Sequence, residues 1–172
     1  MSEDMDKPDH RSARRKDPEG VKLEAWKGTL NDMEAIAEER REDGWDVITL
    51  TAAHTDTVSK DMGDHDDFGL FHVVPDNQAE EFVEWFDPDD FTEYLAYGTD
   101  VEGFMYIVTE FIDPESDRSI LVASRYDAVL ADGLAESAAE EGVLYSHIKT
   151  IDGTTLGKFP HEEYAPLLKR PS

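Results

Sequence analysis

The segment Gly103–Ile112 most restricts the folds open to this chain, because its stretch Phe104–Val108 is apolar on both faces of a strand. Such a strand belongs in the interior of a sheet that is covered on both sides. The run Asp113–Asp117 (DPESD) is rich in turn-forming residues, and Ser119–Tyr126 after it is again rich in β-forming residues. The sequence therefore predicts a hairpin within a sheet whose two faces are both buried.

Further β-rich segments surround this hairpin and predict more strands. The dipeptide Asp152-Gly153 is the clearest turn signal, and it predicts a two-residue type I′ turn, which needs φ > 0 at both central residues. The polar stretch His54–Asp67 is predicted to be a loop. The additional predicted strands are Trp45–Ala53, Phe68–Val74, Phe91–Tyr97, Val143–Ile151 and Thr155–Phe159.

Apolar periodicity predicts three helices. The first starts with Asp17 as N-cap, ends before Gly44, and carries one apolar stripe of Leu23, Trp26, Leu30, Met33 and Ala37. The stripe suits a helix that covers a sheet, with a dimer seam as the alternative. A second helix starts with Asp76 as its cap and ends at Asp87-Pro88, and Ala79, Phe82, Val83 and Phe86 form its apolar face. The third is Asp127–Glu141, with Leu130, Leu134 and Ala138 on one face, and Glu162–Leu168 adds a short helical turn.

These elements predict an α+β fold with a mainly antiparallel sheet and helices packed on it. Their order suggests two β-β-α-β blocks, at about residues 45–98 and 103–151, although the two stretches do not match in sequence. Residues 1–17 are expected to form a polar arm, and residues 18–172 one domain.

The acidic excess indicates the solvent in which the chain works. There are 41 Asp and Glu residues against 16 Lys and Arg, which gives a net charge of −25. The acids are spread along a chain that also has many aromatic residues, so the sequence predicts a folded protein rather than a disordered one. Concentrated salt screens this repulsion, and we expect a halophilic cytoplasmic protein that attracts inorganic cations and a hydration shell but not nucleic acid.

Several classes of function are excluded or disfavoured by what is missing. The chain has no cysteine, which removes disulfides, thiolate zinc sites and a cysteine nucleophile. It also has no GxSxG elbow and no glycine-rich phosphate loop, so we assign no catalytic residue and expect no cofactor. No apolar run reaches the roughly 18 residues of a membrane helix, and residues 1–16 lack the apolar core of a secretory signal.

Two groups of residues are candidate sites. His54, Asp56, Asp64 and His65 could bind a divalent metal, but their spacing matches no known metal motif, so a solvated acidic loop is the main alternative. A ligand pocket could form around Arg125, Tyr126, Tyr145 and His147, provided that their two strands are neighbours in the sheet, and its lining would then extend to Tyr94, Tyr97 and Tyr106. The alternative for this second group is an aromatic core with a paired arginine.

Three segments are similar to those of a known group of proteins: GWDVITLTAAHTDT (Gly44–Thr57), DFGLFHVVPDN (Asp67–Asn77) and FMYIVTEFIDP (Phe104–Pro114). They resemble a family of small uncharacterised haloarchaeal proteins. The resemblance implies an archaeal, high-salt cytoplasmic protein and carries no activity or catalytic residues with it. The main hypothesis is a non-enzymatic binding or interaction module that forms a homodimer. A small-molecule or hydrolytic domain and a metal-dependent hydrolase are the alternatives.

Overall fold

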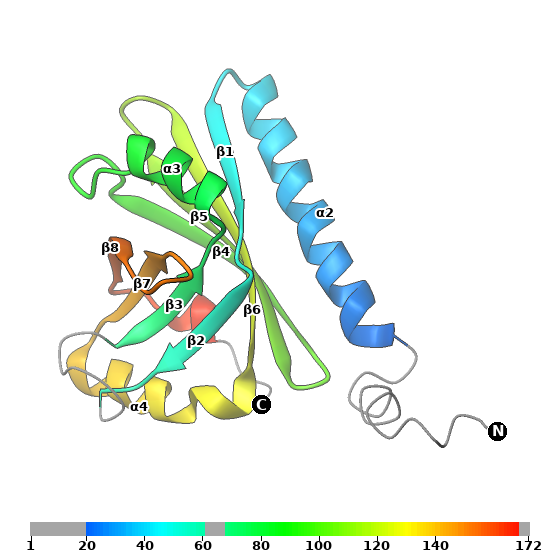
Figure 1. The fold of residues 1–172 in the computed structure, drawn as a ribbon, viewed down its shortest axis with the longest axis vertical. Helices are drawn as coiled ribbons and strands as arrows, with labels where there is room; N and C mark the ends of the chain where they lie inside the picture. Colours follow the sequence, from blue (N-terminus) through cyan, green and yellow to red (C-terminus); the bar gives the residue numbers. More distant parts are fainter. Residues whose placement is uncertain (1–19, 61–67, 169–172) are drawn as a thin grey trace.

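The computed structural model describes residues 20–60 and 68–168, which form two four-stranded sheets with helices packed on them (Figure 1). The predicted α+β class is confirmed. The first sheet has the order β1-β6-β5-β4, with β1 Asp46–Thr51, β4 Glu93–Val101, β5 Phe104–Asp113 and β6 Arg118–Asp127. The second sheet has the order β2-β3-β7-β8, with β2 His54–Val58, β3 Gly69–Val73, β7 Leu144–Lys149 and β8 Thr155–His161.

The β5–β6 hairpin lies inside the first sheet, as its apolar sequence predicts. The two strands pair without a register shift from Phe104 opposite Asp127 to Asp113 opposite Arg118. One face of the hairpin packs against helix α2 (Val21–Glu42), and the other packs against the second sheet. Burying both faces removes a large apolar area from water, and that burial is the main driving force for placing the hairpin here.

Both sheets are mixed, because two pairs of strands that are far apart in the sequence run parallel. Strand β1 pairs with β6, and β3 pairs with β7, while the other four pairs are antiparallel. Each hairpin, β2–β3 and β5–β6, is followed by a helix and then by a strand of the other sheet. The block at residues 45–98 therefore has three strands before its helix, including β2, which was not predicted as a strand, whereas the block at residues 103–151 has two. Each block contributes strands to both sheets.

Helix α2 covers the outer face of the first sheet (Figure 1). Met33 and Ala37 are buried there against Val47 and Leu121, whereas Leu23, at the start of the stripe, is half exposed. The helix ends as predicted: Asp43 is the C-cap and Gly44 follows with φ 90°. It begins at Val21 after Gly20, and the expected cap at Asp17 lies outside the described residues.

Two shorter helices close the space between the sheets. Helix α3 (Asp76–Trp85) buries Ala79 and Phe82, and helix α4 (Asp132–Glu141) buries Leu134 and Ala138. The third helix is shorter than predicted, because Ala128–Ala131 forms a separate 3-10 turn in which Leu130 is exposed. Asp76 is the first residue of α3 rather than its cap, since Pro75 takes the extended capping position. The expected final turn is present at Ala165–Leu168.

The predicted loop at His54–Asp67 is wrong for its first residues, which form β2. Thr55, Thr57 and Val58 are β-branched, and Thr55 is buried opposite His72 of β3. The segment was predicted to be a loop because it is polar, but threonine is compatible with a strand as well as with a loop. Residues 61–67 lie outside the described residues.

The turn between β7 and β8 also differs from the prediction. Gly153 has φ 93°, but Asp152 does not have a positive φ, so the turn is not type I′. The Gly153 amide donates to the Thr150 carbonyl and the Thr150 amide to Thr154, which is the pattern of a three-residue loop with glycine last. The Asp152 carboxylate accepts hydrogen bonds from the Thr150 hydroxyl and from the Thr154 amide, and these bonds lower its pKa.

Candidate functional site

The structure does not bring the four predicted ligand residues together, because β6 and β7 belong to different sheets. The assumption that these strands are neighbours is wrong. On β6, Arg125 lies 4.5 Å above the ring of Trp26 in α2, while buried Tyr126 donates to the Leu167 carbonyl at 2.6 Å. Alternating strand residues point to opposite faces, so this pair is divided between the two faces of the first sheet.

The other two residues lie on the face of the second sheet that points away from the first. His147 is buried, stacks on Phe71 at 3.9 Å between ring centroids, and its Nε2 lies 3.2 Å from the Phe68 carbonyl oxygen. Tyr145 is partly buried beneath the ammonium group of Lys158, which is 4.2 Å from the ring centroid. Both side chains therefore pack against neighbours on that face.

The predicted metal residues are only partly within the described chain. His54 and Asp56 lie on β2, with Nε2 of the imidazole 2.5 Å from Oδ1 of the carboxylate, and Lys149 is 4.0 Å from Asp56. Asp64 and His65 lie outside the described residues. Within residues 20–60 and 68–168, no three His, Asp or Glu side chains are placed to hold a metal ion.

A groove of about 430 Å³ lies between α2 and β4 on the outer face of the first sheet. That volume is in the range of small-molecule sites. Tyr97 is 42% exposed and forms one wall, while Tyr106 and Val108 of β5 are buried and form the floor. The full lining is Thr29, Asp32, Ala96, Tyr97, Gly98, Thr99, Tyr106 and Val108.

A buried ion pair supports the groove from beside its floor. Glu110 of β5 is fully buried and accepts from Nε and Nη2 of Arg40, both at 2.8 Å, and from the Ser119 hydroxyl at 2.6 Å. The Tyr97 hydroxyl is 3.5 Å from the same carboxylate. Burial and the Glu110 charge raise the pKa of Tyr97, so its hydroxyl stays protonated and able to donate at neutral pH.

Two further histidines are buried between the sheets. His72 Nδ1 is 3.0 Å from the Thr55 hydroxyl, and His161 Nε2 is 2.7 Å from the Ser146 hydroxyl. Their remaining ring nitrogens, His72 Nε2 and His161 Nδ1, have no hydrogen-bond partner among the described residues. Burial lowers the pKa of His72 to about 4 and that of His161 to about 3, with a neighbouring histidine adding to each shift. Both rings are therefore neutral structural groups that solvent does not reach.

We expect these histidines to make the protein sensitive to mild acid. In the unfolded chain they take up protons near pH 6.5, but in the folded chain not until about pH 4, so stability falls as the pH drops through this window. His161→Gln removes one such group. Chemical denaturation at pH 7 and pH 5 should show the variant losing roughly 2 kcal/mol less than the wild type over that interval. An equal loss in His161→Gln and in the wild type over this interval would contradict the assignment.

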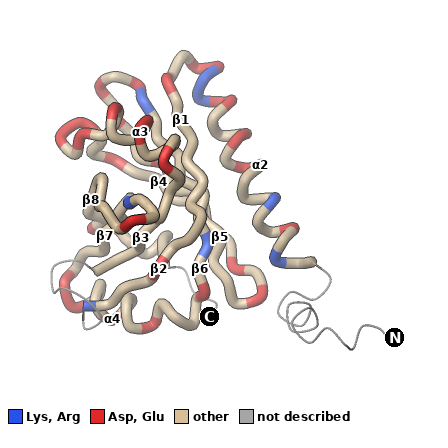
Figure 2. The backbone as a smooth tube through the Cα atoms, in the orientation of Figure 1, with Lys and Arg blue, Asp and Glu red and all other residues tan. Residues whose placement is uncertain are grey.

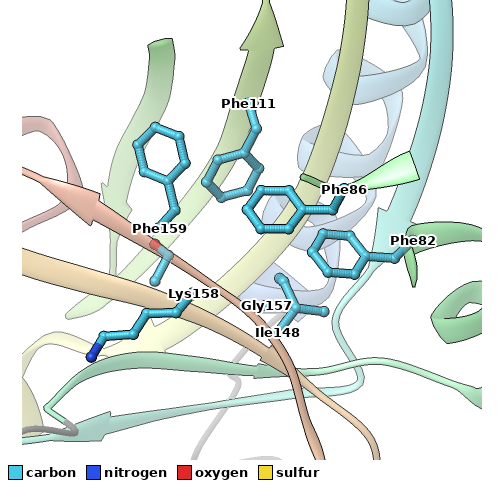
Figure 3. Close-up of a pocket in the computed structure, with 8 residues that line it drawn as sticks. Phe82, Phe86, Phe111, Ile148, Gly157, Lys158 and Phe159 are labelled. Carbon is cyan, nitrogen blue, oxygen red and sulfur yellow. The ribbon is translucent and has the colours of Figure 1, made fainter. Parts of the chain in front are cut away.

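The aromatic residues between α3 and the sheets form a packed cluster rather than a ligand site. Figure 3 shows the rings of Phe82, Phe86, Phe111 and Phe159 turned toward one another, with Lys158 pointing away. The space they enclose leaves no room for a water molecule. A Cβ at Gly157 would lie 2.8 Å from the Phe82 ring, so only glycine permits this close packing.

A model of a protein family matches residues 12–169 of the chain. The chain belongs to the family of unknown function DUF7529. Searches of curated proteins and of solved structures gave no match. DUF7529 therefore brings no assigned activity, and the geometry of the groove is the main evidence for function.

Sequence reasoning identified only part of this site. Tyr97 and Tyr106 were expected to extend the Arg125 and His147 pocket, and they lie instead in the groove with Thr29 and Asp32. The one sequence signal for the groove was Glu110, a charged residue inside an otherwise apolar strand, which implies a buried partner. None of the helices in the described part of the chain has the length and apolar character needed to cross a membrane.

Proposed function

We propose that this DUF7529 protein is a non-enzymatic binding module of a salt-accumulating archaeal cytoplasm, and that it holds a small neutral ligand in the α2–β4 groove. The observation that carries the proposal is the groove itself, with its aromatic wall and hydroxyl groups. The resemblance to haloarchaeal proteins and the net charge of −25 support the setting. Acidic residues, red in Figure 2, are spread over the helices and loops, with fewer basic residues among them.

The salt of such a cytoplasm determines which ligand chemistry the groove can recognise. At about 1 M salt the screening length is only about 3 Å, so an exposed carboxylate such as Asp32 attracts a charged ligand weakly. Apolar contacts become stronger when ions are excluded from surfaces, and short hydrogen bonds persist. The groove offers both, through the rings of Tyr97 and Tyr106 and the hydroxyl group of Thr99. The Thr29 hydroxyl donates to the Ala25 carbonyl, so toward a ligand it can only accept. A neutral compound with hydroxyl groups and one apolar face, such as a sugar or nucleoside, fits this lining.

Ligand-observed NMR in about 2 M KCl tests the proposal with neutral sugars and nucleosides against their phosphorylated or carboxylated counterparts. We expect a neutral compound to bind, Tyr97→Ala to abolish binding, and Tyr97→Phe to weaken it roughly 5- to 10-fold by removing one hydroxyl. Tyr145→Phe removes a hydroxyl from a partly buried tyrosine on the other sheet and should leave affinity unchanged. Binding that survives Tyr97→Ala, or a panel in which only charged compounds bind, would overturn the proposal.

A further inference from the structure

Strand β4 is an edge strand that differs from the other sheet edges of this protein. It is nine residues long, pairs with β5 from end to end without a bulge, and its run Tyr94–Thr99 contains no charged residue. In residues 20–60 and 68–168, the backbone of β4 has no hydrogen-bond partner outside β5. An unbroken edge of this kind presents a row of free amide and carbonyl groups to another strand.

The other edges carry the features by which proteins discourage such pairing. Strand β8 contains Lys158 and Pro160 and has a register irregularity with β7, and β2 is short and carries Asp56. At the edge strand β1, the amide of Thr51 is occupied by the Gln78 side chain of α3. Lysine, proline, bulges, charges and covering elements all protect edges. Among the edge strands of the described residues, β4 has the longest stretch without these features, since its two carboxylates, Glu93 and Asp100, lie near its ends.

Side chains beside this edge are unusually apolar for so acidic a surface. Leu95 and Tyr97 alternate on the outer face of β4, where they are 44% and 42% exposed. Residues Ala165–Leu168 lie against the opposite face, beside Gly98, so they do not cover Leu95 or Tyr97. Two copies carrying −25 each repel one another in dilute buffer, but molar salt screens that repulsion and strengthens apolar contact.

We propose that a second copy of this chain pairs antiparallel with β4 about a two-fold axis at Tyr97, joining the two first sheets into one continuous sheet. The register that uses all nine residues places Leu95 opposite Thr99 of the second copy, and Tyr97 opposite its own counterpart. Glu93 then faces Val101, and Asp100 faces Tyr94, so no carboxylates are directly opposed. The self-complementarity that a two-fold interface requires is thus present in the strand itself.

The pairing also completes the groove between α2 and β4. Tyr97 and Thr99 line the groove at the edge of the sheet, so the second copy's Tyr97 would extend that wall across the axis. The two grooves would then lie on the same face of the joined sheet, one on each side of the two-fold axis. The dimer proposal is independent of the ligand proposal. Molecular mass and cross-linking are measured without ligand, whereas ligand binding is measured from the NMR signals of the compound.

Molecular mass in solution tests the pairing. At about 100 µM protein in about 2 M KCl, light scattering after size exclusion should give twice 19.4 kDa for the wild type. Leu95→Glu should weaken the dimer at least about 10-fold, because a carboxylate replaces an apolar contact at the paired edge. Ile151→Glu, which adds the same charge at an exposed apolar residue of the β7–β8 turn, should remain dimeric. A monomeric wild type, or equal masses for the two variants when both give the wild-type circular dichroism spectrum, would overturn the proposal.

Cysteine cross-linking tests the register without relying on Leu95→Glu. The chain has no native cysteine, so an introduced cysteine is the only thiol in each copy, and any disulfide must join the two copies at that position. Tyr97→Cys places two thiols opposite one another and should give a covalent dimer on mild oxidation, since directly paired Cα atoms are about 4.5–5.5 Å apart. Leu95→Cys should give no covalent dimer, because in this register Leu95 of each copy lies opposite Thr99 of the other copy and not opposite the second Leu95. Equal cross-linking by both variants would show that this register is wrong.

Discussion

Transferred from about 2 M KCl to buffer without added salt, the protein is expected to lose its ordered structure. Helix α3 contains Asp76, Glu80, Glu81 and Glu84 and no basic residue. Helix α4 likewise ends in Glu140 and Glu141, where the negative end of the helix dipole makes carboxylates unfavourable. Lys60 pairs with both of those glutamates at 3.5 and 2.6 Å, but the chain has only 16 Lys and Arg residues for its 41 Asp and Glu residues.

Far-UV circular dichroism and thermal unfolding across a KCl series measure this effect. The screening length shrinks from about 30 Å at 0.01 M to about 3 Å at 1 M, so the melting temperature should rise steeply over that range. An uncharged osmolyte such as sucrose is the control, because it is excluded from the surface without screening charge. A spectrum that stays native in salt-free buffer would show that the acidic surface has another purpose and would remove the case for a halophilic protein.

Replacing Arg40 with methionine should cost about 3–5 kcal/mol of folding free energy. The substitution keeps much of the side-chain volume but leaves the carboxylate of Glu110, which is fully buried, without its bidentate partner. The hydroxyl groups of Ser119 and Tyr97 cannot offset the loss of a full charge in that environment. Because the pair is buried, concentrated salt screens it little, so the cost should persist at about 2 M KCl.

Arg41→Met is the matched control for this experiment. Arg41 is exposed and donates one hydrogen bond to the Val47 carbonyl at 3.1 Å, so its loss should cost about 1 kcal/mol or less. A double variant, Arg40→Met with Glu110→Met, should recover most of the stability lost by the single change, since no charge is then left buried. Denaturant unfolding gives the free energy of unfolding of Arg40→Met, Arg41→Met and the double variant. Equal costs for Arg40→Met and Arg41→Met would mean that the pair contributes little.

The parts of the fold that follow from local sequence were predictable. The β5–β6 hairpin, the end of α2 at Gly44 and the end of α4 at Gly142 each depend on residues within a short window, and the structure has all of them. Alternation and glycine positions report local backbone geometry directly.

The candidate site was less predictable, because it depends on which distant strands become neighbours. Nothing in the sequence near Arg125 or His147 indicates that β6 pairs with β1, or β7 with β3. The predicted pocket was wrong because it assumed that β6 and β7 are neighbours. The groove combines residues of α2 with residues of β4 that are more than sixty positions away in the sequence. Local periodicity carries no information about such contacts.

The two parallel strand pairs also have a consequence for the time course of folding. The β4–β5–β6 meander closes short loops, whereas pairing β1 with β6 joins segments such as Asp46 and Arg118, and so encloses a long stretch of chain. Closing a long loop costs more entropy and slows assembly. The meander should accordingly acquire amide protection first in a pulse-labelling experiment, and β1 should join it as one of the last steps before the native state.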